Sequence, residues 1–207
     1  MISFHFLLDL PSHINTEIYR LKNQAKRVIG NYPSMNAIPH ITINNYHPNP
    51  GDFHEAGFAH FKRPINHLPP VTFEIDGFDC FNDQNGHSKT IYANVQLNAE
   101  SRFWLKELWK TTGKGSGKPH ITVARSLTAE QFNLLWPYFQ RRELKLSFTV
   151  SKFTILRVKY TKGEFLSEFY REFEFLGPPD ALAESYRNHQ ATQLKFYSAV
   201  SQQVSLF

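Results

Sequence analysis

The sequence predicts an α+β fold made of two similar halves related by a pseudo-twofold axis. A tetrapeptide, Pro-His-Ile-Thr, occurs at residues 39–42 and again at 119–122. Each copy follows a segment whose apolar residues have helical spacing, and each copy alternates like a strand. Most remaining segments also alternate and are joined by turn residues. Each half is therefore expected to contain a strand, a helix and a second strand.

The first half begins with an apolar run at 3–10, which predicts a buried strand. An amphipathic helix is expected to start at Ser12 and to end at Gly30. Residues 39–43 form the next strand, and a polar loop rich in Pro, His and Asn follows over 44–57. The helical residues expected to face the core are Ile14, Ile18, Leu21, Ala25 and Val28.

The second half begins with two alternating segments, 71–78 and 90–97, which predict a hairpin. A helix is expected over 99–112, followed by a loop of Gly, Lys and Ser at 113–118 and a strand at 119–123. The order of the first half is therefore repeated.

The chain then has the pattern of a further helix and two strands. Thr128, with Gln131 three residues later, has the spacing of a capping box and predicts the helix start. The two strands are expected at about 145–159 and 165–176.

The composition is that of a globular protein with a substantial core. The chain has 207 residues, of which 41% are hydrophobic and 19 are Phe. We expect one domain over 1–176 and a C-terminal tail over 177–207, to which no role is assigned. Because no long apolar run or signal-peptide pattern is present, we expect a cytoplasmic location and no membrane partner. A monomer is also expected.

The charge and the cysteine content restrict the kind of site. A formal net charge of +5 favours anionic partners such as RNA or nucleotides. The single cysteine, Cys80, excludes an internal disulfide and a C-x-x-C site. Apart from the two histidines of the repeated string, the histidines have spacings that fit no closed ligand set, so neither a metal nor another cofactor is expected.

The repeated tetrapeptide is the strongest functional signal. In a chain of this composition one copy is expected about 0.002 times by chance. Side chains two apart on a strand share a face, so His40 and Thr42 point one way, as do His120 and Thr122. The aliphatic residues between and after them face the core. If the halves pack about their axis, the two polar faces meet across one groove.

Two imidazoles and two hydroxyls suit the cleavage of a phosphodiester. One neutral imidazole can take a proton from the attacking water while a protonated one gives a proton to the leaving oxygen. Threonine hydroxyls can donate to the non-bridging phosphate oxygens without adding a charge that would lower both histidine pKa values.

The paired H-x-T-x motifs, at 40–43 and 120–123, resemble those of the 2H phosphoesterase superfamily, and most closely its 2'-5' RNA ligase-like branch of RNA 2',3'-cyclic phosphodiesterases. The resemblance covers about 1–176, and the second motif continues as Val-Ala-Arg up to Arg125, as the branch often does. It implies a bilobal fold in which two antiparallel sheets surround a central groove with helices outside.

The resemblance also implies an activity and a role for each residue. The activity is metal-independent opening of a 2',3'-cyclic phosphate at an RNA end or on a small nucleotide, which leaves a 2'-phosphate. His40 would protonate the departing 3'-oxygen and His120 would activate the attacking water. Thr42 and Thr122 would hold the phosphate, and Arg125 is a further phosphate-binding candidate. Branch members often have an Arg near the start of the first strand, where this chain has Ser, Phe and His.

Alternative roles remain open for the loop at 113–118 and for Arg125. The loop at 113–118 is not a P-loop, because Thr112 stands where that motif needs Gly and Pro119 where it needs Ser or Thr. Lys114 or Lys118 either approaches the substrate phosphate or belongs to a solvated basic loop. Arg125 lies on the face opposite to the His-Thr pair if the strand is regular, so a surface ion pair competes with phosphate binding.

Other functions also remain open. The same groups would catalyse 2'-5' RNA ligation by microscopic reversibility. A non-catalytic RNA-binding or nucleotide-binding module would bind with strong salt dependence and without turnover. A structural duplicate would have neither property.

Overall fold

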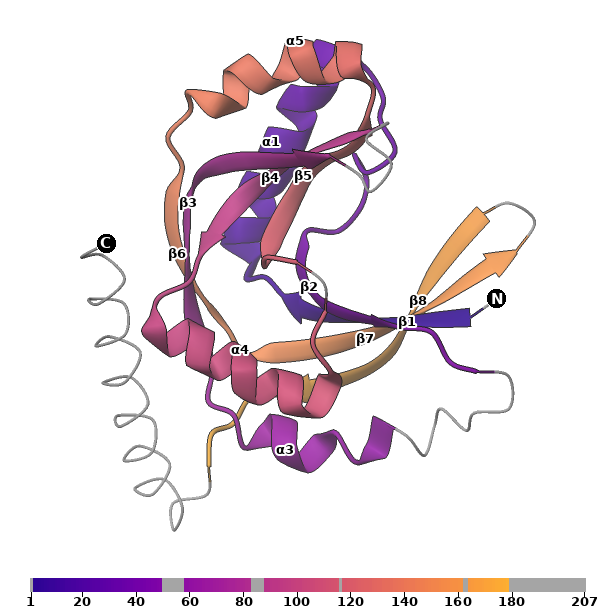
Figure 1. Ribbon diagram of the computed structural model, residues 1–207, viewed down its shortest axis with the longest axis vertical. Helices are drawn as coiled ribbons and strands as arrows, with labels where there is room; N and C mark the ends of the chain where they lie inside the picture. Colours follow the sequence, from indigo (N-terminus) through magenta and orange to yellow (C-terminus); the bar gives the residue numbers. More distant parts are fainter. Residues whose placement is uncertain (1, 50–57, 83–87, 116, 162–163, 179–207) are drawn as a thin grey trace, which may run out of the picture.

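The protein forms an antiparallel sheet covered by helices (Figure 1), in a computed structural model that describes residues 2–49, 58–82, 88–115, 117–161 and 164–178. All the strands of the described residues belong to one eight-stranded sheet in the order β6-β3-β4-β5-β2-β1-β7-β8. The α+β class is confirmed, but the expectation of two separate sheets is wrong. The predicted tail lies outside the described residues from residue 179 onward.

The two halves of the sheet are joined at its centre by one pair of facing residues. Ile41 of β2 faces Ile121 of β5, and backbone pairing at this point makes the two four-stranded parts continuous. On either side of this junction the strand order is symmetric, since β4-α4-β5 corresponds to β1-α1-β2. Figure 1 shows the two parts running in different directions from the junction.

The repeated units lie close to the predicted positions. In the first half they are β1 (Ile2–Asp9), α1 (Ser12–Ile29) and β2 (His40–Tyr46). In the second they are β4 (Lys89–Gln96), α4 (Ala99–Thr112) and β5 (His120–Leu127). Strand β2 continues into the segment that was expected to be loop, because its residues 44–46 still pair with β1.

The remaining elements are α3 (Lys62–Asn66), β3 (Val71–Asn82), α5 (Ala129–Gln140), β6 (Lys145–Val150), β7 (Lys152–Thr161) and β8 (Glu164–Glu174). The expectation of a single strand over 145–159 is wrong, because this segment contains the two strands β6 and β7. The chain leaves β6, which pairs with β3 at one edge of the sheet, and enters β7, which pairs with β1 in the other half. An alternating pattern cannot reveal this change of partner, since both strands have the same period.

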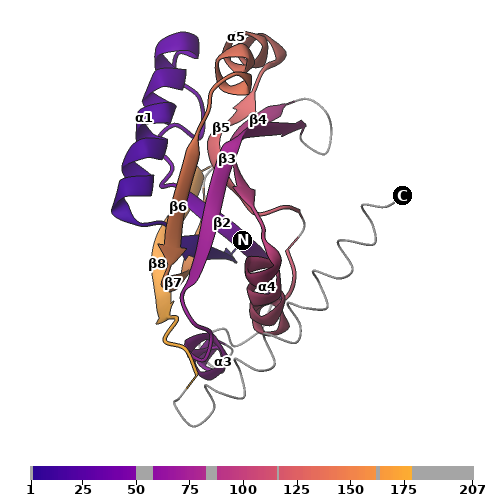
Figure 2. The same cartoon turned by 90° about the vertical axis from the view of Figure 1, so that its left-hand side faces the viewer.

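Each crossover helix packs against the opposite half. Helix α1 contacts β5 and α5, and α4 contacts β2, so the halves are interlocked. Figures 1 and 2 both show α1 beside α5. The predicted core face of α1 is confirmed at Ile14, Ile18, Leu21 and Ala25, but Val28 is 39% exposed, because it lies in the last turn.

The helix starts follow local rules. Asn98 caps α4 by accepting from the backbone N–H of Ser101, and the predicted capping box of Thr128 and Gln131 at the start of α5 is confirmed. In the part of the chain that the structure describes, no helix is long and apolar enough to span a membrane.

Candidate active site

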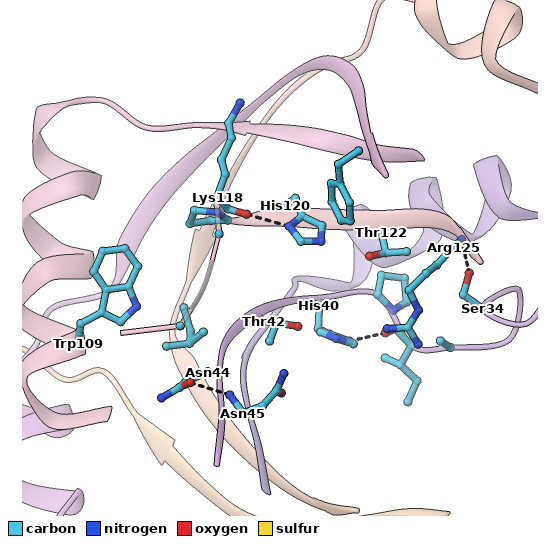
Figure 3. Close-up of a pocket in the computed structure, with 18 of the residues that line it drawn as sticks. Ser34, His40, Thr42, Asn44, Asn45, Trp109, Lys118, His120, Thr122 and Arg125 are labelled. Atoms are coloured by element: carbon cyan, nitrogen blue, oxygen red, sulfur yellow. Dashed lines mark hydrogen bonds between the residues drawn. The ribbon is translucent and has the colours of Figure 1, made fainter. Parts of the chain in front are cut away.

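The predicted meeting of the two motifs is confirmed. His40, Thr42, His120 and Thr122 all line one groove of about 640 Å³ at the junction of β2 and β5. Figure 3 shows these side chains facing the same space. The intervening aliphatic residues point into the core, where Ile41 and Ile121 are fully buried.

The two histidines are held in the same way. His40 Nδ1 lies 2.8 Å from the carbonyl oxygen of Ile38, and His120 Nδ1 lies 2.8 Å from that of Lys118. A carbonyl oxygen only accepts, so Nδ1 carries the hydrogen in both rings. In the neutral state Nε2 therefore has the free lone pair, and it is the atom that can exchange a proton in the groove.

Burial keeps both imidazoles neutral in the free protein. The pKa of His40 is lowered to about 4, first by burial and then by the nearby charges of Lys22, His5 and Arg125, although its bond to Ile38 opposes the shift. The pKa of His120 is also lowered, mainly by burial. A bound anion would oppose these effects, because it stabilises a charged imidazolium.

Arg125 reaches the groove because β5 is irregular. Ile91 faces Ala124 and Tyr92 faces Thr122, so Val123 is an extra residue on β5, that is, a β-bulge. Val123 and Ala124 are both buried, and the side chain of Arg125 returns to the face of the two motifs. Of the two alternatives left open by the sequence, the strand is therefore not regular here, and Arg125 lines the groove with the two motifs.

The loop before the second motif packs against the first half. A Cβ at Gly115 would lie 2.2 Å from the carbonyl oxygen of Ile43, so only glycine permits this approach of the loop to β2. Lys118 lines the groove, whereas the Lys114 ammonium lies 5.6 Å from the centre of the Trp109 ring. Lys118 therefore remains the candidate of the two for phosphate contact.

Aromatic side chains border the second histidine. The Tyr92 ring lies 5.0 Å and the Phe81 ring 5.2 Å from the ring of His120. Tyr92 is buried and its hydroxyl donates to Asp79, so its ring packs beside His120 and is not an open surface on which a nucleobase could stack. Phe81 is 40% exposed and lines the groove.

Sequence reasoning missed Lys22 and Ser34, which also line the groove. Lys22 is on α1, and only 2% of its surface is exposed. A signal was present, since Lys22 lies four residues after Ile18 and three before Ala25, on the apolar face of the helix. Ser34 carried no comparable signal, because it follows the helix in an irregular segment.

The groove is suited to an anion. Those of its lining residues that the structure describes include Lys22, Lys118 and Arg125, and none of them is Asp or Glu. Among the described residues no three His, Cys, Asp or Glu side chains are grouped to hold a metal ion. The site therefore presents cations, hydroxyls and two oriented imidazoles to whatever occupies it.

Comparison with solved structures supports the fold. TT0787 of Thermus thermophilus is 15% identical with a TM-score of 0.60, over 86% of this chain and 100% of that chain. E. coli LigT complexed with 3'-AMP is 14% identical with a TM-score of 0.58, over 84% and 98%. E. coli LigT complexed with phosphate is 16% identical with a TM-score of 0.56, over 83% and 96%. No curated protein matches the sequence significantly.

The family is shown by the sequence itself. The family model described as the 2'-5' RNA ligase superfamily matches residues 10–161, which contain both H-x-T-x motifs and most of the sheet. This match confirms the resemblance to the 2H phosphoesterases. The chain belongs to the 2'-5' RNA ligase superfamily.

Proposed function

We propose that the protein is a metal-independent phosphodiesterase that opens a 2',3'-cyclic phosphate at an RNA end or on a small nucleotide to a 2'-phosphate. The observation that carries the proposal is the matched pair of histidines. Each has its Nδ1–H bound to a backbone carbonyl and its Nε2 available in the groove, where the described lining residues include cations and no carboxylate.

Each step of the proposed reaction can be assigned to a group of the groove. His120 takes a proton from water as the water oxygen bonds to phosphorus, and His40 gives a proton to the 3'-oxygen as its bond to phosphorus breaks. Thr42 and Thr122 donate to the non-bridging oxygens, and Arg125 offsets their charge. The anionic substrate raises the low pKa of His40, so the proton donor is formed when the substrate binds.

Nucleotide ligands of a structural relative support this substrate class. E. coli LigT, which shares the fold, has been crystallised with 3'-AMP and with phosphate. A phosphate between Thr42 and Thr122 would place its ester oxygens beside the two imidazoles. If a 5'-hydroxyl takes the place of water, His120 can accept its proton as its oxygen bonds to phosphorus, and His40 can protonate the departing 3'-oxygen, which leaves a 2'-5' phosphodiester. We therefore propose 2'-5' ligation, which reverses the cleavage of such a bond to a cyclic phosphate, as a further activity.

The direct test is hydrolysis of an oligonucleotide that ends in a 2',3'-cyclic phosphate, in the presence of EDTA. The expected product carries a 2'-phosphate, and both His40→Ala and His120→Ala should lower the rate by about 10²–10⁴-fold. Salt-sensitive binding without turnover by the wild type would instead identify a non-catalytic RNA-binding or nucleotide-binding module. Loss of activity in EDTA would contradict the metal-independent mechanism.

The direction of proton transfer needs its own test. A nitrophenyl phosphodiester of a nucleoside has a leaving group that departs without protonation. With this substrate His40→Ala should recover much of its lost rate, whereas His120→Ala should stay inactive because water still needs a base. The opposite pattern would exchange the two roles.

A further inference from the structure

Lys22 is a buried cation with no carboxylate partner among the described residues. Its ammonium donates to the carbonyl oxygens of Ser34, at 2.9 Å, and Ala37, at 2.7 Å. An ammonium has three N–H groups, so one remains beyond these two bonds. Burying a charge without an opposite charge is costly, and the residue borders the groove. These features are expected of a cation whose partner is a ligand.

Lys22 and Arg125 are tied to the same residue. The Ser34 carbonyl accepts from Lys22, and the Ser34 hydroxyl accepts from the backbone N–H of Arg125 at 2.8 Å. The two cations come from α1 and β5, so each half of the protein supplies one. Burial and the charge of Arg125 lower the pKa of Lys22 to about 8.

We infer that Lys22 is a phosphate-binding residue of the groove, which acts with Arg125 on the non-bridging oxygens of the bound phosphate. The inference rests on the groove being a phosphate site, as proposed above, but it requires binding and not turnover. The titratable groups that interact electrostatically with Lys22 are Arg125 on β5 and His40 on β2. Arg125 is a cation and His40 is a cation or neutral, so neither supplies a negative charge. A bound anion is therefore the countercharge that this end of the groove needs.

A purely structural role makes a different prediction. The two carbonyl bonds also fasten the segment between α1 and β2, so Lys22 would then serve only to hold that segment. Lys22→Met would in that case lower the Tm and leave anion affinity unchanged. The two roles are separated by measuring binding and folding on the same variants.

Binding of inorganic sulfate, a tetrahedral dianion, is measured by calorimetry at pH 7 for the wild type, Lys22→Met, Lys22→Arg and Lys26→Met. Lys26 is the matched control, since it lies one turn further along α1 and is exposed. Because Lys22→Met loses a charge-assisted hydrogen bond, its affinity for sulfate should be lower than that of the wild type by about tenfold or more. Lys26→Met should bind like the wild type, and Lys22→Arg should keep part of the affinity.

A further readout needs no variant and keeps the inference testable if Lys22→Met folds poorly. In the wild type, sulfate binding near pH 8.5 should take up protons, since sulfate does not titrate there and Lys22 does. Calorimetry in buffers of different ionisation enthalpy measures this uptake.

The inference is overturned if the wild type does not bind sulfate, if binding takes up no protons near pH 8.5, or if Lys22→Met binds like Lys26→Met. A wild type that binds sulfate through Lys22 but does not open cyclic phosphates would refute the proposed function alone.

Discussion

At the scale of single residues, the chemistry of the site depends on how burial and neighbouring cations shift the pKa values of the two imidazoles. Both histidine pKa values are lowered, that of His40 to about 4, so neither ring is charged at neutral pH in the free protein. The proposed reaction needs His40 charged and His120 neutral. Because both pKa values are lowered, this state reaches its largest population in the free protein below the ordinary histidine pKa.

The value of kcat/KM should accordingly be bell-shaped in pH with its maximum below about 6.5, the ordinary histidine pKa. As the pH rises above the His120 value, both rings become neutral in the free protein and kcat/KM falls. The profile is measured with a 2',3'-cyclic mononucleotide. A flat profile through the histidine range, or a maximum above pH 7.5, would be inconsistent with this account.

The residues that form the motif could be predicted from the sequence, and some of their neighbours could not. His40, Thr42, His120 and Thr122 were found because a strand's period of two places them on one face. The position of Arg125 depends on a bulge at Val123, and no alternation pattern reports an inserted residue.

At the scale of elements, the loop before β5 fixes the second motif against the first half. Gly115 approaches β2 so closely that a Cβ would lie 2.2 Å from the Ile43 carbonyl oxygen. The loop then leads through Lys118, whose carbonyl accepts from His120. Packing of the loop and orientation of the histidine are therefore linked.

Gly115→Ala should displace this loop and lower kcat by at least about tenfold, with a loss of stability of about 1–3 kcal/mol from the steric conflict. Lys114→Ala is the control in the same loop and should have little effect on either quantity, because its side chain contacts only the Trp109 ring in the described contacts. Activity assays and thermal unfolding check both variants. Normal activity in Gly115→Ala would show that the loop does not orient His120.

Element positions followed from the sequence where the local signal was strong. The capping box of α5 and the whole of α4 were predicted, since caps and helical spacing are local properties. The division of 145–159 into β6 and β7 was not, because it depends on which strands they pair with. The join of the two halves into one sheet was missed for the same reason.

At the scale of the whole molecule, the groove lies where the two halves meet, and hydrogen bonds as well as helix packing fix their relation. Besides the backbone pair of Ile41 and Ile121, the Tyr32 hydroxyl lies 3.1 Å from the carbonyl oxygen of Lys22 and 3.3 Å from that of Val123. Tyr32 thus connects α1 of the first half with β5 of the second. The distance between the histidines depends on such links.

Tyr32→Phe should lower stability by about 1 kcal/mol, as expected for one buried hydrogen bond, and lower kcat more than it raises KM. The reason is that the halves lose a link while the groups that bind substrate remain. Tyr138→Phe is the matched control, since Tyr138 is 66% exposed. Steady-state kinetics and chemical unfolding give the answer, and an unchanged kcat would mean that Tyr32 does not help to align the halves.

The central claim is that His40 and His120 act as one acid and base pair. The measurement that tests it most directly compares the wild type, His40→Ala, His120→Ala and the double variant on an oligonucleotide ending in a 2',3'-cyclic phosphate, in EDTA. Each single variant should lose about 10²–10⁴-fold in rate, and the double variant should lose little more, because residues that act as a unit are not additive. Near-normal activity in either single variant, or losses that multiply in the double variant, would contradict the account.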